Sequence, residues 1–424
     1  LKDSRTFQLT LYRIINTLIH KEYFPSQWNT LLIAPIHKKG KDAEEGKSYR
    51  PVHIASIVSK LISQILEKKV TAVIEPSEEQ LGFTAEHGCR DNGFVLRTLI
   101  DKYKKDGLYL AFVDFTGAFD SINRQKLIEI LTKETKIPNS NEIIKFLVAM
   151  HNNIKAKIKG DDTEIYENIG IKQGDAISPR LFNIYINKLP TEVNNGQDTD
   201  AVTLWKRLIK CLLYADDLVL FSTTAEGLNK QLESLRKYCV KLELTVSIEK
   251  TEVMHIHRFN IGTKIKESLP QITFNNIPLK YTRSFKYVGI TVTHDGEFKE
   301  HTEKAIDKAT TAVKILKGKI YRLGLNSPLQ MKIILFKAYI QPILMYGMEV
   351  INPSKGQIDQ INKIITDYAR WALGASPKSQ TNATLTLCNF KPIQYDITKQ
   401  QINYLYTVMH RHKESITSTA LNHI

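Results

Sequence analysis

Two adjacent carboxylates, Asp216 and Asp217, are the residues in this chain whose types and spacing point most clearly to chemistry. An apolar run at 211–213 precedes them and another at 218–221 follows, which predicts two strands joined by a tight acidic turn. Adjacent carboxylates repel each other, and holding them together is costly unless a cation neutralises them. Taken alone, such a pair is more often a solvated turn, in which Asp is common. A metal site is predicted only if further acidic residues join it.

A third carboxylate, Asp114, follows the apolar run 108–113, which is typical of a buried strand. Residues 115–120 are then expected to open a helix that continues to Leu131. Asp114 would lie at the C-terminal end of a strand, a usual place for a catalytic group. Three carboxylates at neighbouring strand ends can bind two Mg²⁺ ions, with Mn²⁺ as a substitute, roughly 3.5–4 Å apart. That geometry stabilises both the attacking and the leaving oxygen of a phosphoryl transfer.

Length and charge narrow the class of protein. The chain of 424 residues is too long for one compact core and predicts two or three subdomains. It carries 59 Lys and Arg against 44 Asp and Glu, a formal charge of +15, which favours a nucleic-acid partner over a membrane. No apolar stretch approaches the roughly 20 residues of a membrane span. Four widely spaced cysteines disfavour a zinc site or a disulfide framework and suit a reducing intracellular compartment, the nucleus or the cytoplasm.

The hydrophobic pattern divides the chain into three parts: a first part before residue 108, a middle part from about 108 to 292 and a last part at 297–424. The first part predicts a helix, a strand that leads into a basic hairpin, a second short strand and an amphipathic helix, at 5–24, 30–36, 49–52 and 55–74. The middle part alternates strands and helices, and its predicted elements are a hairpin at 154–171, helices at 181–189 and 226–243, and a strand at 285–290. The last part is helical in pattern, with helices predicted at 328–346 and 358–373.

Short motifs occur in a fixed order along nearly the whole chain. They are Tyr49-Arg50-Pro51-Val52, Gln80-Leu81-Gly82-Phe83, 112–122, Lys172-Gln173-Gly174-Asp175-Ala176-Ile177-Ser178-Pro179, Tyr214-Ala215-Asp216-Asp217, Ile248-Glu249-Lys250-Thr251, Tyr287-Val288-Gly289, Pro342-Ile343-Leu344-Met345-Tyr346-Gly347 and Ala372-Leu373-Gly374. With this ordered set the chain resembles the reverse transcriptases of non-LTR (long interspersed element) retrotransposons. The resemblance implies an α+β right-hand polymerase, with fingers at 1–107, a palm at 108–295 that has finger insertions around 140–172, and a helical thumb at 296–424. It also implies an RNA template, a DNA primer or RNA–DNA hybrid, dNTP substrates and Mg²⁺.

The resemblance gives the acidic residues and their neighbours specific roles. Asp114, Asp216 and Asp217 would hold the two ions, and Lys250 would act as a general acid toward pyrophosphate. Phe119 would be the steric gate that excludes a ribose 2′-hydroxyl, although simple core packing also suits an aromatic residue there.

Other motif residues would bind the nucleotide. Gln173 and Gly174 would contact the nucleotide or the template, because an amide can hydrogen-bond and glycine permits close backbone approach. Lys38 and Arg50 would grip the triphosphate, with Lys39 and Lys41 as rivals to Lys38. Asp120 is expected to cap or orient the helix after Asp114 rather than to bind metal.

Two alternatives stay open on the sequence. A domesticated relative could bind RNA as a structural component without catalysis, although retention of all three carboxylates, Phe119 and Gln173 argues against it. A group II intron-type reverse transcriptase is the second, and the long helical tail argues against it. Because the chain begins with Leu1 rather than Met, we expect it to be part of a longer polypeptide.

Overall fold

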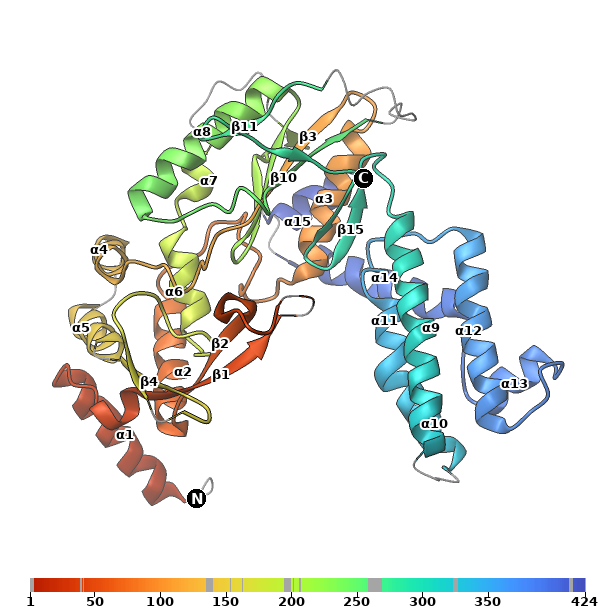
Figure 1. Cartoon of the computed structure of the whole chain (residues 1–424), viewed down its shortest axis with the longest axis horizontal. Helices are drawn as coiled ribbons and strands as arrows, with labels where there is room; N and C mark the ends of the chain where they lie inside the picture. The colour runs from red at the N-terminus through yellow and green to blue at the C-terminus, as the bar shows by residue number, and fades with distance from the viewer. Residues whose placement is uncertain are drawn as a thin grey trace.

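Helices and strands alternate through the first two thirds of the chain, and the last third is helical, in the computed structural model (Figure 1). The structure describes residues 4–38, 40, 42–134, 140–152, 154–161, 163–193, 200, 202–205, 207–257, 269–322, 327–411 and 415–423. The strands form separate sheets with helices around them, so the predicted α+β class is confirmed. Within the described residues, no helix is both long and apolar enough to cross a membrane.

A five-stranded sheet in the order β13-β10-β3-β9-β8 lies at the centre of the middle part. Its strands are β3 (Leu108–Val113), β8 (Cys211–Tyr214), β9 (Asp217–Ser222), β10 (Glu252–Ile256) and β13 (Lys280–Tyr281). The central strand β3 pairs antiparallel with both β9 and β10. It is buried on both faces, which explains why its sequence is an unbroken apolar run. The strands predicted on either side of the acidic pair and before Asp114 are confirmed.

The two faces of this sheet belong to two different hydrophobic cores. Alternate residues of β3 point to opposite faces, so Ala111 lies in one core and Leu110 in the other. The first core includes α8 (Ala225–Leu242), and the second includes α3 (Cys89–Tyr103). The sheet is therefore held from both sides, and its strand ends are firmly placed.

A second sheet, in the order β2-β1-β4-β5, lies in the N-terminal part and is flanked by helices (Figure 1). Its strands are β1 (Thr30–His37), β2 (Tyr49–Ile54), β4 (Ile154–Ile158) and β5 (Glu164–Glu167). The helices of this region are α1 (Arg5–His20), α2 (Ile57–Thr71), α4 (Arg124–Glu134), α5 (Ser140–His151), α6 (Ser178–Tyr185) and α7 (Leu189–Glu192). β1 pairs antiparallel with β2 and parallel with β4, so the hairpin predicted at 154–171 joins the first part of the chain.

Two local expectations for the middle part were wrong. The helix after Asp114 begins at Arg124 rather than near residue 115, because Gly117 has a φ of 57° and a turn closes from its carbonyl to the Asp120 nitrogen. The strand predicted at 285–290 is two strands, β14 (Ser284–Tyr287) and β15 (Ile290–Thr293), separated by a turn with positive φ angles.

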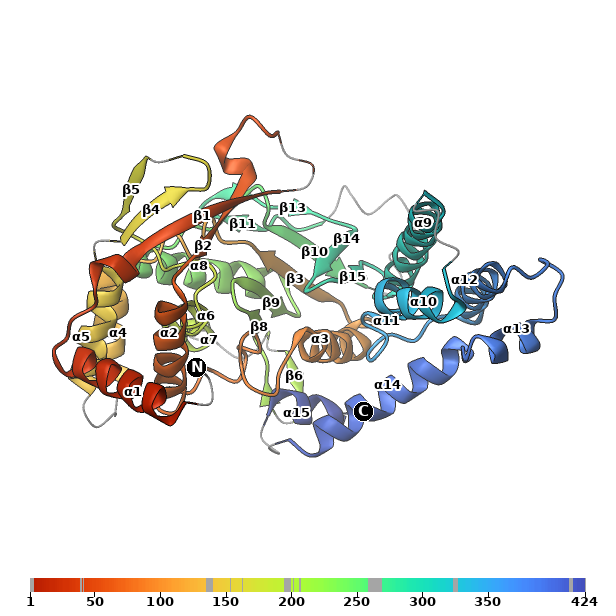
Figure 2. The ribbon, with the colours of Figure 1, turned by 90° about the horizontal axis from the view of Figure 1, so that it is seen from below.

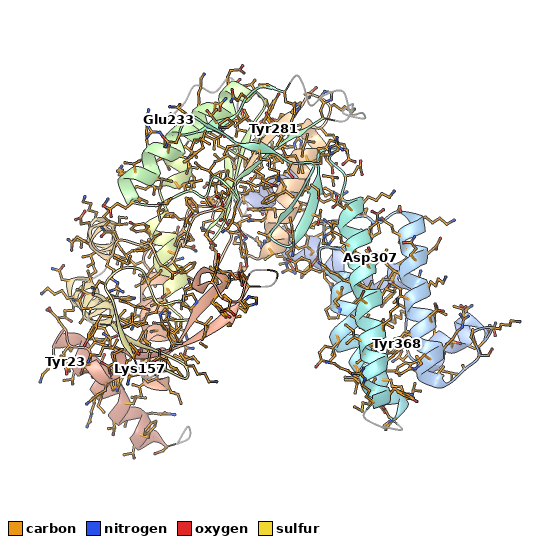
Figure 3. All side chains as sticks on the ribbon, in the orientation of Figure 1. Tyr23, Lys157, Glu233, Tyr281, Asp307 and Tyr368 are labelled. Carbon is orange, nitrogen blue, oxygen red and sulfur yellow. The ribbon has the colours of Figure 1, made fainter. Side chains whose placement is uncertain are left out.

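The C-terminal third is a set of helices, and all but the last of them pack around a third core (Figure 1). They are α9 (Lys299–Arg322), α10 (Leu329–Leu335), the π-helix η5 (Phe336–Ile340), α11 (Gln341–Met345), α12 (Lys355–Leu373), α13 (Thr381–Leu387), α14 (Ile393–Met409) and α15 (Ile416–His423). The single helix expected at 328–346 is thus interrupted by a π-helix before Pro342, which has no N–H to continue the α-helical pattern. The buried Tyr368, labelled in Figure 3, donates its hydroxyl to the Lys332 carbonyl at 2.7 Å and packs against Phe336.

The end of the chain returns to the middle part. In Figure 2, α15 lies beside α3, and α14 connects it to the other C-terminal helices. Tyr404 and Val408 of α14, and Ile416 of α15, are buried in the same core as β3 and α3. The last two helices therefore stabilise the sheet that carries the acidic residues.

Candidate active site

The three carboxylates singled out from the sequence lie together at one end of the central sheet. β8 and β9 form a hairpin with a two-residue turn at Ala215 and Asp216. The last residue of β3 pairs with the second residue of β9 in antiparallel register. One further step along both strands places Asp114 opposite Asp217. The strand register alone therefore brings Asp114 to the acidic turn.

A buried amide side chain, Gln80, holds the acidic turn. Its Oε1 accepts a hydrogen bond from the Ala215 nitrogen at 2.9 Å, and its Nε2 donates to the Ala215 carbonyl at 3.2 Å. Ala215 has a φ of 55°, a conformation that tight hairpin turns use and that few non-glycine residues adopt. A Cβ at Gly82 would lie 2.3 Å from the Ala215 nitrogen, so only glycine allows this approach. Gln80 and Gly82, for which the sequence suggested no role, fix the backbone that presents Asp216.

Burial and mutual repulsion disfavour the charged forms of the acidic pair. Burial, followed by the charges of Asp216 and Asp114, raises the pKa of Asp217 to about 6. Burial is also the largest cause that raises the pKa of Asp216, and Asp114 adds to it, while a backbone hydrogen bond and Lys250 oppose it. A group of carboxylates with too little positive charge nearby matches the oxygen ligands that a hard divalent cation prefers.

One positive charge does reach this group, from Lys250. Its Nζ donates to Asp114 Oδ2 at 2.9 Å, from the loop that precedes β10. The same loop also binds the main chain of Asp114 through two hydrogen bonds. The Ser247 nitrogen donates to the Asp114 carbonyl, and Thr251 Oγ1 accepts from the Asp114 nitrogen. Although Asp114, Asp216 and Asp217 share this sheet end, no three His, Cys, Asp or Glu side chains in the described part of the chain, these three included, are already arranged to hold a metal ion. The Lys250 ammonium instead occupies one oxygen of Asp114.

Phe119 lies in the turn after Asp114 and stacks on Phe182 of α6. Their ring centroids are 4.9 Å apart with an interplanar angle of 15°. Phe119 is only half-buried, so one part of its ring packs on the core and another part faces outward. The packing role and the gate role that the sequence allowed are therefore compatible.

Gln173 and Gly174 lie beside this turn. Gln173 Nε2 donates to Asp120 Oδ1 at 2.9 Å, and the Gln173 carbonyl accepts from the His53 nitrogen of β2 at 2.9 Å. Gly174 has a φ of 96° and its α-carbon faces the His53 carbonyl. The expectation that Asp120 caps the following helix was wrong, because the Asn123 side chain accepts from the third residue after it. Asp120 instead orients the Gln173 amide.

The two basic residues expected to bind triphosphate lie on β2 and at the end of β1. Arg50 is exposed and pairs with Ile36 across the two strands. Lys38 is half-buried, and its charge lowers the pKa of Asp120 against the larger effect of burial, which places it near the same turn. Lys39 and Lys41 lie outside the described residues. The structure thus gathers Lys38, Gln173 and Gly174 around the Phe119–Asp120 turn, five residues from Asp114.

Comparison with known proteins agrees with this geometry. The family model for "Reverse transcriptase (RNA-dependent DNA polymerase)" matches residues 36–292. The RNA-directed DNA polymerase from mobile element jockey of Drosophila melanogaster is 22% identical over 88% of this chain and 42% of its own length. The Pol polyprotein of the type-2 retrotransposable element R2DM of the same species is 25% identical over 77% of this chain and 30% of its length. The chain spans less than half of these relatives.

Solved structures of telomerase are also similar. Apo telomerase from Candida tropicalis matches 99% of this chain and 74% of its own chain, with 13% identity and a TM-score of 0.43. The predicted resemblance to reverse transcriptases of mobile elements is confirmed by the family model and the curated relatives. The match to the family model covers more than half of the chain and includes the three carboxylates, Gln80 and Gln173. The chain belongs to the reverse transcriptase (RNA-dependent DNA polymerase) family.

Proposed function

We propose that this chain is an RNA-directed DNA polymerase that extends a primer 3′-hydroxyl with dNTPs by a two-metal mechanism. The observation that supports it most is the juxtaposition of Asp114, Asp216 and Asp217 at one sheet end. The raised pKa values of the acidic pair fit a site that needs divalent cations, Mg²⁺ or Mn²⁺. The three carboxylates would hold two ions, which when bound activate the 3′-hydroxyl and neutralise the triphosphate.

Nucleotide addition would join the primer 3′-oxygen to the dNTP and release pyrophosphate. The primer 3′-hydroxyl gives up its proton to a water molecule and its oxygen forms a bond to the α-phosphorus of the dNTP. The bond from that phosphorus to the bridging oxygen breaks, and pyrophosphate leaves with the electron pair. Lys250 would move its hydrogen bond from Asp114 to the leaving group and donate a proton to it. Lys38 and Arg50 would bind the triphosphate oxygens, and Gln173 the nucleotide or template. A formal charge of +15 suits RNA template and DNA primer as partners.

As a right-hand polymerase, the chain would have its fingers, palm and thumb in the three parts of the fold. The N-terminal sheet and its helices, with the inserted strands β4 and β5, would be the fingers, at 1–107 and around 140–172. The central sheet would be the palm at 108–295, and the helices after 296 the thumb. Because α15 packs on α3, the end of the thumb region would also brace the palm.

Replacement of Phe119 by Val should relax the choice of sugar. If the ring blocks a ribose 2′-hydroxyl, we expect the preference for dNTP over rNTP in kcat/KM to fall about tenfold or more, the equivalent of a clash of ~1.4 kcal/mol. The measurement is single-nucleotide extension with each substrate. The matched control is Phe182→Leu, which removes the ring stack between Phe119 and Phe182 but leaves the Phe119 ring in place. Equal loss of discrimination in both variants would assign Phe119 to packing alone.

Primer extension on an RNA template tests the whole proposal. The chain is incubated with a labelled DNA primer annealed to RNA, dNTPs and either Mg²⁺ or Mn²⁺, and product length is read on a denaturing gel. We expect extension that chelation of the metal abolishes. Tight binding of the hybrid without extension in either metal would refute the proposal and indicate the RNA-binding role instead.

A further inference from the structure

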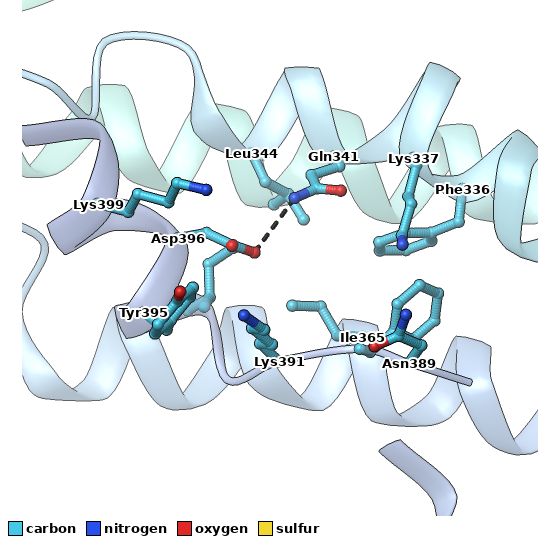
Figure 4. Close-up of a pocket in the computed structure, with 12 residues that line it drawn as sticks. Phe336, Lys337, Gln341, Leu344, Ile365, Asn389, Lys391, Tyr395, Asp396 and Lys399 are labelled. Carbon is cyan, nitrogen blue, oxygen red and sulfur yellow. Dashed lines mark hydrogen bonds between the residues drawn. The ribbon is translucent and has the colours of Figure 1, made fainter. Parts of the chain in front are cut away.

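A basic groove lies in the C-terminal helices, apart from the acidic site. It consists of two adjoining cavities of about 390 Å³ and 460 Å³ that share Lys337, Gln341, Asp396 and Lys399. One wall is the π-helix η5 with α11, and the other is α14 (Figure 4). Phe336 and Leu344 from one side and Ile365 from the other add apolar side chains to its lining (Figure 4). Neither cavity is large enough for more than part of an extended ligand.

The charges in this groove are unbalanced. Lys337, Lys391 and Lys399 line the first cavity, and none of the three has an acidic ion-pair partner among the described residues. Neighbouring lysines behave differently, since Lys304 of α9 pairs with Glu300 at 2.6 Å. The carboxylate within the cavity, Asp396, already accepts a hydrogen bond from Gln341 Nε2 at 3.2 Å (Figure 4). Over both cavities, Lys337, Lys391, Lys399 and Arg90 face two carboxylates, Asp396 and Glu349, so the lining keeps an excess of positive charge.

An aromatic ring lies among these ammonium groups. The Lys391 Nζ is 3.8 Å from the centroid of the Tyr395 ring, and the ring is half exposed. The hydrogen bond and charge of Lys391, with the charge of Lys399, hold the pKa of Tyr395 below its usual value. An exposed ring flanked by cations can stack a base while the cations bind the adjacent phosphates.

The second cavity extends the basic lining to α3, the helix behind the central sheet. Arg90 of α3 lines it together with Lys337 and Lys399, and the Arg90 guanidinium lies 5.3 Å from the Tyr404 ring centroid. Arg90 directly follows Cys89, whose thiol interacts with Tyr214 of the catalytic hairpin. The groove thus runs from the α14 side of the thumb region to the helix that backs the acidic turn. The π-helix in its wall is a rare element that is frequently found at functional sites.

We propose that this groove binds a single nucleic-acid strand by its sugar–phosphate backbone, with one base stacked on Tyr395. The inference rests on the proposed polymerase function, which brings a template strand to this protein. Lysines around an exposed aromatic ring favour a nucleic-acid strand over an acidic peptide, because a peptide carboxylate offers no base to stack. The two small cavities in series suit an extended strand rather than a duplex.

The test is equilibrium binding of fluorescently labelled 15-nucleotide oligouridylate and oligothymidylate, measured by anisotropy without divalent metal or dNTP. The groove variant is Lys391→Glu with Lys399→Glu. The matched control is Lys230→Glu with Lys237→Glu on α8, two exposed lysines that change the total charge by the same amount. We expect the groove variant to bind at least about tenfold more weakly than the control, with a shallower salt dependence. The oligomer that binds more tightly to the unchanged protein identifies the strand as RNA or DNA.

Two further variants separate specific binding from charge alone. Tyr395→Leu should weaken binding several-fold while Tyr395→Phe should not, because only the first removes the ring. Lys391→Arg with Lys399→Arg should restore binding. Equal binding by the groove variant and the control, or equal displacement of the oligomer by a polyglutamate peptide of the same length, would overturn the proposal.

Different variants test the proposed polymerase function and the proposed binding of a strand in the groove. Asp216→Asn should bind the oligomer as the unchanged protein does while losing extension. The groove variant should still extend a primer whose RNA template is too short to leave the acidic site. Absence of extension by the unchanged protein, with oligomer binding to the groove intact, would count against the proposed function and not against the groove.

Discussion

Asp216→Asn is expected to reduce the rate of primer extension by about 10³-fold or more while the protein stays folded. The change keeps the shape of the side chain but removes a carboxylate from the group that would hold the ions. It also removes one of the charges that raise the pKa of Asp217. Because the charges repel one another in the absence of metal, the variant should melt at the same temperature as the unchanged protein or slightly above it. Single-turnover extension on an RNA template and thermal melting in a chelator measure the two effects.

Asp359→Asn is the matched control for this prediction. Asp359 is exposed on α12 and is remote in sequence from the acidic hairpin. We expect it to leave both extension and melting unchanged. Extension by Asp216→Asn at more than about a tenth of the unchanged rate would contradict the assignment of Asp216 as an essential ligand. A lowered melting temperature would show instead that the carboxylate supports the turn.

The acidic site was largely predictable because each of its parts is a local pattern. The strand before Asp114 and the two strands around the acidic pair are apolar runs of ordinary strand length. Antiparallel register then places Asp114 opposite Asp217 with no further information. The segment after Asp114 was mispredicted for a local reason too. An apolar helical pattern extends back to residue 115, but Gly117 and the Asn123 cap delay the helix to Arg124.

The supports of the site could not be predicted, because they join residues far apart in sequence. Gln80 reaches a turn 135 residues away, and a buried Gln is contrary to the usual exposure of that residue type. The π-helix η5 was hidden because its residues fit an ordinary helical pattern equally well. The Lys391–Tyr395 contact at the start of α14 is local, but the groove beside it also needs Lys337 and Gln341 from distant helices, which no periodicity places there.

A buried ion pair between Asp91 and Arg411 is another long-range support. Arg411 Nη1 donates to Asp91 Oδ1 at 2.6 Å across 320 residues, and both side chains are almost completely buried. Tyr404 also donates its hydroxyl to Asp91 Oδ1 at 2.9 Å, and the Gly88 nitrogen donates to Oδ2 at 2.7 Å. The neighbouring Asn92 donates to the Leu213 carbonyl of β8 at 3.2 Å. The network therefore links the last helices to α3 and, through α3, to the acidic hairpin.

Arg411→Met is expected to lower the free energy of unfolding by about 3–5 kcal/mol, because it leaves the Asp91 carboxylate buried without its partner. Asp91→Leu combined with Arg411→Met should recover part of that loss, since neither charge is then left alone. Urea denaturation of the single and double variants measures both. A loss below about 1 kcal/mol in Arg411→Met would contradict the role of the pair.

The pH dependence of Arg411→Met separates the lost ion pair from lost packing. His87 lies 3.9 Å from Asp91, and burial, followed by the Arg411 charge, lowers its pKa in the unchanged protein. Because the folded-state pKa of this histidine is lowered, the unfolded chain binds a proton more readily than the folded protein. The folded protein therefore loses stability as the pH falls through about 6.5, the pKa of an unfolded histidine. Without Arg411 one of the causes that lower the His87 pKa is gone, so its folded pKa rises toward the unfolded value and acid costs the variant less stability than it costs the unchanged protein. The stability gap between the two proteins should therefore be smaller at pH 5.5 than at pH 8, whereas a pure packing defect such as Val408→Ala should leave the same gap at both values.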